Sequence, residues 1–156
     1  MDSRPTEQLS AVDGLAQLSF LVHGTLERLA AGHGLSIIQA RLLGVLRDRT
    51  PTMKELGRLL GLDKSSTSGL VDRAEARGLV ARAPSQTDGR AVLVNLSEHG
   101  RALVADVAAR FETEIDAVLD RLKPRERETL SRLVSRLLVA HAADHGIDLS
   151  AGIDIR

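Results

Sequence analysis

Apolar residues recur at helical spacing through residues 1–35, the first of three segments into which the chain divides. The apolar positions follow one another at intervals of three or four residues: Leu15, Leu18, Val22, Leu26 and Leu29. Gly32 and Gly34 come directly after them. A stripe of this kind predicts one long amphipathic helix that ends at the glycines.

Two further helical patterns occupy residues 97–156. The first repeats every seven residues, as the a and d positions of a coiled coil do. Its members are Val104, Phe111 and Val118, with Ala108, Ile115 and Leu122. Pro124 then opens another helix at the position where its missing N–H costs nothing. The stripe of that helix consists of Leu130, Leu133, Val134, Leu137, Leu138 and His141.

Long apolar stripes can close on one another within one chain, as in an intramolecular bundle. Three of them beside one compact central segment instead favour pairing with a second copy of the chain. We therefore predict a homodimer that is held together by the N-terminal helix of residues 1–35 and the C-terminal helices of residues 97–156.

The central segment, residues 36–96, carries closely spaced helix caps. Ser36 with Gln39 and Thr52 with Glu55 both match the capping box, in which a hydroxyl accepts from the N3 amide while the N3 side chain reaches back. The two boxes predict one helix to about residue 47 and a shorter one through residue 60. Gly61 can end the shorter helix in a left-handed conformation.

Asp63 is the expected N-cap of a third central helix, which reaches about Arg77 and is followed by Gly78. Only residues 61–63 separate it from the helix before. This order predicts a helix-turn-helix.

After Gly78 the helical spacing changes to the alternation that is typical of strands. Apolar residues at 92, 94 and 96 alternate with Leu93 and Asn95, and residues 79–83 can pair with them. Asp88-Gly89 between the two strands is a strong signal for a hairpin turn, and Ser97 caps the helix that follows. The sequence thus predicts a mainly α fold with a small β-hairpin wing, in which residues 36–96 form a winged helix-turn-helix lobe.

Charge and composition narrow the function. The 156 residues contain 21 Lys and Arg and 21 Asp and Glu, but residues 41–91 carry 10 basic and 6 acidic groups, so the central segment is locally basic. Phe20 and Phe111 are the only aromatic residues, which excludes a stacking surface for single-stranded nucleic acid. With no cysteine, disulfides and thiol chemistry are excluded. No signal pattern and no membrane-length apolar run occurs, so we expect a cytoplasmic location.

The third central helix has a polar face that suits DNA. Its buried stripe should be Thr67, Leu70, Val71 and Ala74, and its opposite face holds Lys64, Ser65, Ser66, Ser68, Gly69 and Asp72, with Arg73 and Arg77 at the margins. Short hydroxyls near a helix N-terminus can reach base edges in a major groove, and the helix dipole favours phosphate. An ordinary solvated face is the alternative, but the position directly after another capped helix favours DNA recognition.

The hairpin supplies a second set of DNA contacts. Arg90 lies at its tip and Arg82 on the facing strand, and an extended arginine can enter the minor groove, where negative potential is concentrated. Asp88 can hold Arg90 through a charge-assisted pair. Lys54 and Arg58 lie on the first helix of the helix-turn-helix and should face the phosphate backbone. An ordinary turn with a solvated arginine is the alternative reading.

At these residues the chain resembles a known family. Residues 36–100 resemble the winged-helix domain of the multiple-antibiotic-resistance regulator (MarR) family of bacterial transcription regulators. The resemblance rests on LGRLLGLDKSSTSGLVDRAEARGLV at 56–80, on the wing around Asp88-Gly89-Arg90, on LVNLSEHGRAL at 93–103 and on LKPRERETLSRLV at 122–134.

The resemblance implies a homodimer on double-stranded DNA with an inverted-repeat operator. Each copy would place its recognition helix (64–77) in the major groove and Arg90 in the minor groove. Family members commonly repress, and many release DNA when a small phenolic or anionic ligand enters a cleft between the dimer helices and the DNA-binding lobe. His23, His33 and Arg41 are the residues expected to line such a cleft.

Four positions depart from the family pattern. Ser85 and Gly89 stand where many members have Asp and Arg, and Gly69 replaces a frequent arginine. Lys123 precedes Pro124 where a Ser or Thr cap is usual, so we expect that helix to fray more readily. The missing cysteine excludes peroxide sensing through a reactive thiol.

Other functional classes have weaker support. His141 and His145 stand at i and i+4, a spacing that can hold zinc. An ordinary solvated helix end is the favoured interpretation of this pair, so we expect no bound metal or other cofactor. No phosphate loop, nucleophile elbow or paired-carboxylate pattern occurs, so an enzyme is not expected. A metal-responsive regulator and a winged-helix protein-interaction module remain alternatives.

Overall fold

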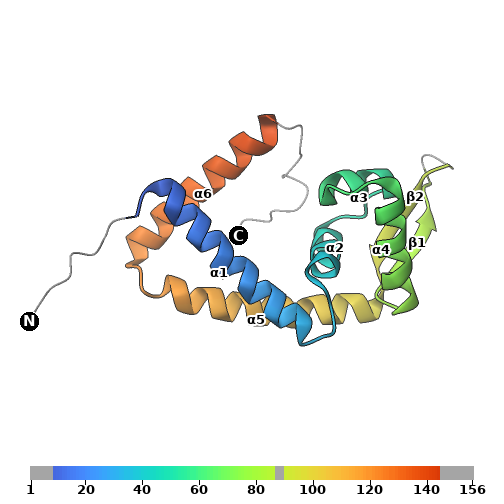
Figure 1. Ribbon diagram of the computed structural model, residues 1–156, viewed down its shortest axis with the longest axis horizontal. Coiled ribbons are helices and arrows are strands. Elements are labelled where there is room, and N and C mark those ends of the chain that lie inside the picture. The colour runs from blue at the N-terminus through green and yellow to red at the C-terminus, as the bar shows by residue number, and fades with distance from the viewer. Residues whose placement is uncertain (1–8, 87–89, 145–156) are drawn as a thin grey trace, which may run out of the picture.

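The computed structural model describes residues 9–86 and 90–144, and this part of the chain is mainly helical with one β-hairpin, as predicted (Figure 1). Its elements in chain order are α1 (Ala11–Ala31), α2 (Ile37–Asp48), α3 (Met53–Leu60), α4 (Lys64–Ala76), β1 (Val80–Pro84), β2 (Val92–Leu96), α5 (Glu98–Leu119) and α6 (Pro124–Asp144). The elements from α2 to β2 form a compact lobe at one end of α5, and α6 follows its other end (Figure 1).

The predicted caps set the bounds of the central helices. The Gln39 amide donates to the Ser36 hydroxyl, and the Ser36 amide donates to the Gln39 side chain, so the capping box of α2 is complete. Thr52 and Glu55 exchange the same two hydrogen bonds at the start of α3. Gly61 ends α3 with φ +67°, in the left-handed region, as predicted.

Helix α4 follows its predicted bounds and burial pattern. Its buried residues are the four of the expected stripe: Thr67, Leu70, Val71 and Ala74. A Cβ added at Gly57 of α3 would lie only 3.0 Å from the Thr67 Oγ1. The absence of a side chain at Gly57 therefore lets the two helices of the helix-turn-helix approach closely.

The hairpin is antiparallel, as predicted, and its first strand is shifted by one residue from the expected bounds. Strand β1 begins at Val80 rather than Leu79, because the Leu79 amide donates to the Ala74 carbonyl at 3.0 Å and completes the end of α4. The Val94 amide also donates to the Pro51 carbonyl at 2.9 Å. The segment between α2 and α3 thus pairs with β2 through an isolated bridge of Thr52 with Leu93, which the sequence pattern did not predict.

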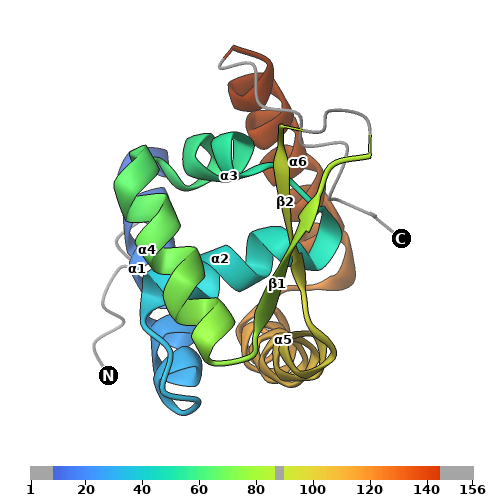
Figure 2. The same ribbon diagram turned by 90° about the vertical axis from the view of Figure 1, so that its right-hand side faces the viewer.

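The buried core lies almost entirely in the lobe. Helix α2 is surrounded by α3, α4 and the hairpin, and α5 is seen nearly end-on beside them (Figure 2). The cluster of buried apolar residues runs from Ala30 to Leu96, and Leu103 and Val104 of α5 pack against it. The lobe therefore has a hydrophobic core of its own.

The outer helices are packed much less completely. Along α1, Leu15 and Leu18 remain 54% and 45% exposed, and along α6, Leu133 and Leu137 remain 47% and 59% exposed. The stripe of α6 is not covered by another helix of the same chain, so the described residues do not close into an intramolecular bundle. The Lys123 amide donates to the Glu126 carboxylate at 2.8 Å, so Glu126 supplies half of a capping box where a hydroxyl cap is missing.

Candidate nucleic-acid interface

The N-terminal turn of α4 is organised around one carboxylate. Asp63 accepts from the Ser66 amide at 2.7 Å and from the hydroxyls of Ser65 and Ser66 at 2.8 and 3.0 Å. The amide bond of Ser66, followed by the two hydroxyl bonds, lowers the pKa of Asp63 below its ordinary value. Asp63 is thus ionised at neutral pH and holds both serine hydroxyls at the exposed end of the helix.

A cleft of about 910 Å³ lies between this turn, α3 and the hairpin. Its cationic lining comes from all three elements: Lys54 of α3, Lys64 of α4, and Arg82 and Arg90 of the hairpin. Among the described residues, no carboxylate lines the cleft. Four of the predicted DNA contacts are thus brought together beside a helix N-terminus, in an arrangement that attracts phosphate.

The remaining predicted contacts on the helices are distributed around this cleft. Ser68 also lines it and is half-buried, whereas Ser65, Ser66 and Arg58 are exposed outside it. These exposed groups remain accessible to a duplex that covers the cleft.

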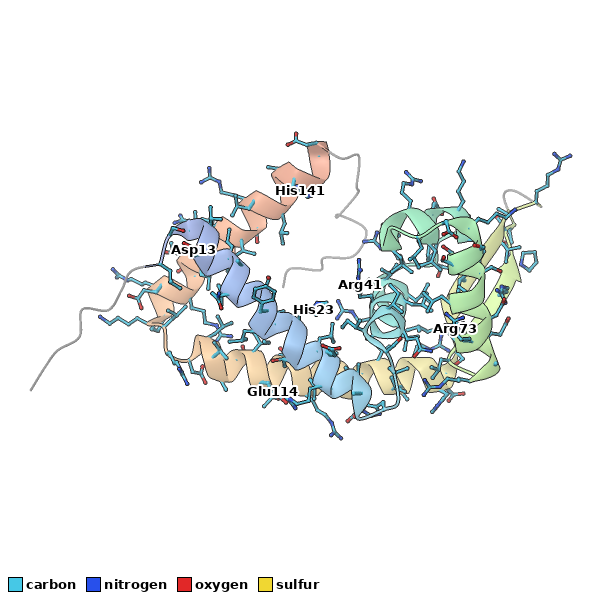
Figure 3. The ribbon with its side chains drawn as sticks, viewed as in Figure 1. Asp13, His23, Arg41, Arg73, Glu114 and His141 are labelled. Carbon is cyan, nitrogen blue, oxygen red and sulfur yellow. The ribbon has the colours of Figure 1, made fainter. Side chains whose placement is uncertain are left out.

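Arg73 covers Gly69, one of the positions of α4 that were predicted to contact DNA. A Cβ added at Gly69 would lie 3.3 Å from the Arg73 Nη1, so the guanidinium folds over the glycine. Arg73 is exposed and lies on α4 of the lobe (Figure 3). The recognition helix therefore retains one long cation over this part of its surface.

Arg82 and Arg77 make protein contacts that the sequence did not reveal. The Arg82 Nη2 lies 2.5 Å from an oxygen of Asp72, and its Nη1 pairs with Glu75, so Arg82 bridges β1 and α4. Arg77 donates to the carbonyls of His33 and Gly34 at 3.0 and 2.8 Å. Both guanidinium groups were predicted to contact DNA, and both are engaged with other parts of the chain.

The tip of the wing is only partly described. Arg90 is exposed and lines the cleft, and the Ser85 amide donates to the Ala91 carbonyl at 2.9 Å near the end of the hairpin. The predicted pair of Asp88 with Arg90, and the Gly89 of the turn, fall on residues 87–89, which lie outside the described residues.

A second cavity, of about 520 Å³, lies between α1, α2 and α5. Most of its wall is aliphatic, and Leu26, Leu43 and Val107 contribute from the three helices. Its charged lining residues are Arg41, Arg47, Glu112 and Asp116. The cavity therefore combines an apolar interior with charged groups of both signs.

The structure brings one of the three predicted cleft residues to this cavity. Arg41 lines it, whereas His23 and His33 are not among its lining residues. The His33 Nε2 instead lies 3.2 Å from the Asp106 Oδ2 of α5. The sequence analysis missed Arg47, although positions 41, 44 and 47 follow one another at intervals of three along α2, a spacing that indicated a shared face.

The metal alternative gains no support from the described residues. His141 lies on α6, and His145 is outside the described part of the chain. Within residues 9–86 and 90–144, no group of three His, Cys, Asp or Glu side chains is placed to hold a metal ion. Nor does any described helix have the length and apolar character to cross a membrane.

Comparison with known proteins connects this geometry to a family. Residues 33–91 match the sequence model of the MarR family. Over 106 residues the chain is 32% identical to the HTH-type transcriptional repressor NicR of Pseudomonas putida, and the alignment covers 67% of each chain. It is 33% identical over 96 residues to the organic hydroperoxide resistance transcriptional regulator of Bacillus subtilis, with 62% of each chain covered.

The fold extends the similarity beyond these alignments. The structure superposes on the crystal structure of RV1404 from Mycobacterium tuberculosis with a TM-score of 0.71 and 29% identity, covering 88% of this chain and 98% of that chain. In sequence, the chain spans 61 to 67% of the length of the first curated relatives it matches. The winged-helix lobe and the long outer helices are thus similar to those of a solved bacterial protein.

Proposed function

The chain belongs to the MarR family of transcriptional regulators, and from this premise we propose that it acts as a homodimeric repressor in the cytoplasm. The dimer would bind an inverted-repeat operator in double-stranded DNA and release it when a small ligand enters the cavity between α1, α2 and α5. In this proposal residues 36–96 read the DNA, and residues 1–35 and 97–156 hold the two copies together.

The cationic cleft between α4 and the hairpin is the observation that carries the proposal. Lys54, Lys64 and Arg90 come from three separate elements and line the same cleft. A DNA backbone offers a row of phosphates to such a cleft, while the exposed serines of α4 can reach base edges. A module that bound only protein would not need cations converging beside a capped recognition helix.

The exposed stripes of α1 and α6 support a second copy as the partner of the outer helices. Large apolar faces on soluble chains mark interaction sites, and Leu18 and Leu137 lie on two such faces. Two identical lobes related by a two-fold axis require an inverted repeat, with half-site centres about 10 bp apart. The similarity to a relative named as a repressor supports repression as the outcome.

The cavity between α1, α2 and α5 supports release by a ligand. Its volume of about 520 Å³ falls within the range of pockets that hold small molecules. The aliphatic wall suits an apolar body, and Arg41 at the cavity suits an anionic or hydrogen-bond-accepting end.

Selection of binding sites from a random pool of duplexes tests the proposal with the full chain. We expect an inverted repeat, and for the selected site a plot of log K against log salt with a slope of about −5 to −7, as neutralisation of six to eight phosphates requires. A scrambled half-site should remove most of the specific affinity and leave the slope largely unchanged. A single unrepeated site, or a slope near −1, would contradict the proposed mode of binding.

A further inference from the structure

Arg77 stands at the C-terminal end of the recognition helix and reaches away from the DNA-facing cleft. Its two nitrogens donate to consecutive backbone carbonyls, those of His33 and Gly34, in the turn between α1 and α2. Gly34 has φ +65°, so the turn uses a conformation in which a glycine is strongly preferred. A planar guanidinium that bonds two neighbouring carbonyls fixes direction as well as distance.

The same end of α4 has a second attachment, to α5. The Ser97 hydroxyl donates to the Gly78 carbonyl at 2.5 Å, and the Ser97 amide donates to the Leu79 carbonyl at 3.0 Å. A Cβ added at Gly100 would lie 1.9 Å from the Leu79 carbonyl oxygen, so the start of α5 touches the backbone there. One attachment alone would leave a pivot, whereas two separate ones restrict the direction in which α4 points.

The turn that receives Arg77 is itself held by α5. The His33 Nε2 lies 3.2 Å from the Asp106 Oδ2, and Arg110 of the same helix lies 3.1 Å from that oxygen. The next residue, Val107, lines the cavity between α1, α2 and α5. The turn is therefore attached to α4 on one side and to the cavity-forming helix on the other.

We propose that Arg77 is a positioning residue of the recognition helix rather than a DNA contact. In this proposal α5 holds the α1–α2 turn in position through the contact of Asp106 with His33, and the turn in turn holds Arg77. The proposal rests on the proposed DNA-binding function, because it concerns how the lobe presents α4 to the major groove. The α1–α2 turn would then connect the cavity between α1, α2 and α5 to the recognition helix α4.

Arg73 offers a matched comparison one helical turn away. Both arginines are exposed on α4, but Arg73 folds over Gly69 on the recognition surface, whereas Arg77 is bound to the α1–α2 turn. A lysine keeps the charge at either position and loses the planar fork. The Lys variants therefore separate geometry from charge, and the Gln variants report the charge itself.

The first experiment compares Arg77→Lys with Arg73→Lys in the full chain, on the selected operator and on a scrambled duplex. We expect Arg77→Lys to weaken operator binding about 3- to 10-fold, which corresponds to the loss of one hydrogen bond of typical strength, with unchanged binding to the scrambled duplex. Arg73→Lys should change binding to the operator and to the scrambled duplex by a similar factor, because a phosphate contact carries no sequence information. Partial unfolding would lower binding to both duplexes equally, so the ratio of the two affinities isolates positioning.

The salt dependence separates the two roles further. Arg73→Gln should flatten the slope of log K against log salt by about 1 to 2 for the dimer, and Arg77→Gln should lower operator affinity with a smaller change of slope. If Arg77→Lys behaves as wild type while Arg77→Gln flattens the slope as Arg73→Gln does, Arg77 contacts phosphate and the proposal is wrong.

The connection through the turn is tested by His33→Ala, with Arg110→Ala as its control. Both remove a partner of Asp106, but only the first releases the turn. We expect the ratio of operator to scrambled binding to fall for His33→Ala and to remain unchanged for Arg110→Ala. Equal ratios in wild type and His33→Ala would overturn this part of the proposal.

Amide hydrogen exchange gives a readout that needs no DNA. Amides at residues 76–79 should exchange faster in Arg77→Lys than in wild type and remain unchanged in Arg73→Lys, because only Arg77 holds that end of α4. A chain that selects no duplex but shows this pattern would refute the proposed function and retain the attachment. Unchanged exchange in Arg77→Lys would refute the attachment even if operator binding is found.

Discussion

Apolar side chains are buried in the lobe of α2 to β2, whereas many of those on the outer helices α1 and α6 are exposed. In the lobe, Leu42 and Val94 are completely buried, whereas Phe20 of α1 and Leu137 of α6 are 70% and 59% exposed. Both regions have helical periodicity of similar regularity in the sequence. The difference teaches that an amphipathic stripe predicts a helix and a face, while the partner of that face is decided by the tertiary structure.

The two regions should therefore respond differently to substitution. In the lobe, a lost apolar contact removes buried surface from a single chain, and its cost does not depend on protein concentration. On the outer helices, the cost arises only where a second copy covers the stripe, and it depends on concentration.

The largest expected effect is that of Leu137→Asp on α6. A carboxylate in a covered apolar stripe is strongly unfavourable, so the dimer should separate, and losing the second lobe should weaken operator binding by about 10²- to 10⁴-fold. Sedimentation and mobility-shift titration measure the two effects. Arg132→Asp places a carboxylate at an exposed position on the side of α6 that faces away from the stripe, and it should leave both unchanged. A wild type that is folded and monomeric at micromolar concentration would overturn the interpretation of the outer helices.

A core substitution in the lobe, Leu42→Ala, should cost about 2–5 kcal/mol of unfolding free energy, because Leu42 is fully buried. The loss is expected at every protein concentration in urea denaturation. Leu18→Ala on α1 is the comparison, and its cost should shrink as the protein is diluted, because fewer chains then have the stripe covered by a second copy. If both variants showed the same dependence on concentration, the contrast between the regions would be lost.

Removal of the wing cation by Arg90→Ala should weaken operator binding by about 1–3 kcal/mol and leave the dimer intact. The measurement is a mobility-shift titration at fixed salt, with sedimentation as the check on assembly. Arg125→Ala removes an exposed charge at the start of α6, which lies far from the hairpin (Figure 1), and should have little effect. Equal affinities of wild type and Arg90→Ala would refute the minor-groove assignment.

The smallest effect is a loss of lobe stability in acid. Hydrogen bonds from Thr52 lower the pKa of Glu55, as those from Ser66 and Ser65 lower that of Asp63. A depressed folded-state pKa adds stability that is present above the unfolded value of about 4 and is lost as pH falls through the folded value. Urea midpoints should thus decline below about pH 4, and Asp63→Asn, which keeps a capping oxygen, should decline less. An identical decline in wild type and Asp63→Asn would show that ionised Asp63 does not contribute to the stability that is lost in acid.

Local chemistry explains why so much of the fold could be predicted. The hydroxyls and carboxylate at Ser36, Thr52 and Asp63 satisfy helix amides within three residues, so the sequence alone determines where each helix begins. The bridge between Pro51 and β2 could not be found in this way, because its hydrogen bond joins residues 43 positions apart. It depends on how the whole lobe packs.

The candidate site was predictable only in part, for a related reason. The cap at Asp63 and the hairpin signal placed Lys64 and Arg90 on surfaces that the structure brings to one cleft. It also assigned Arg77 and Arg82 to DNA, because charge and face can be read from a sequence while the acceptors of a long side chain cannot. Carbonyls in a distant turn and carboxylates on a facing helix engage these two guanidinium groups.

The exposed stripe of α6 has a consequence for gene dosage. If a protomer must associate before it can read both half-sites, the amount of operator-competent protein varies with the square of protomer concentration wherever most chains are unassociated. Halving synthesis in that range lowers the competent form about fourfold. A promoter controlled in this way would respond to regulator level with a threshold rather than in proportion, and a gene that represses its own transcription would hold its product close to that threshold.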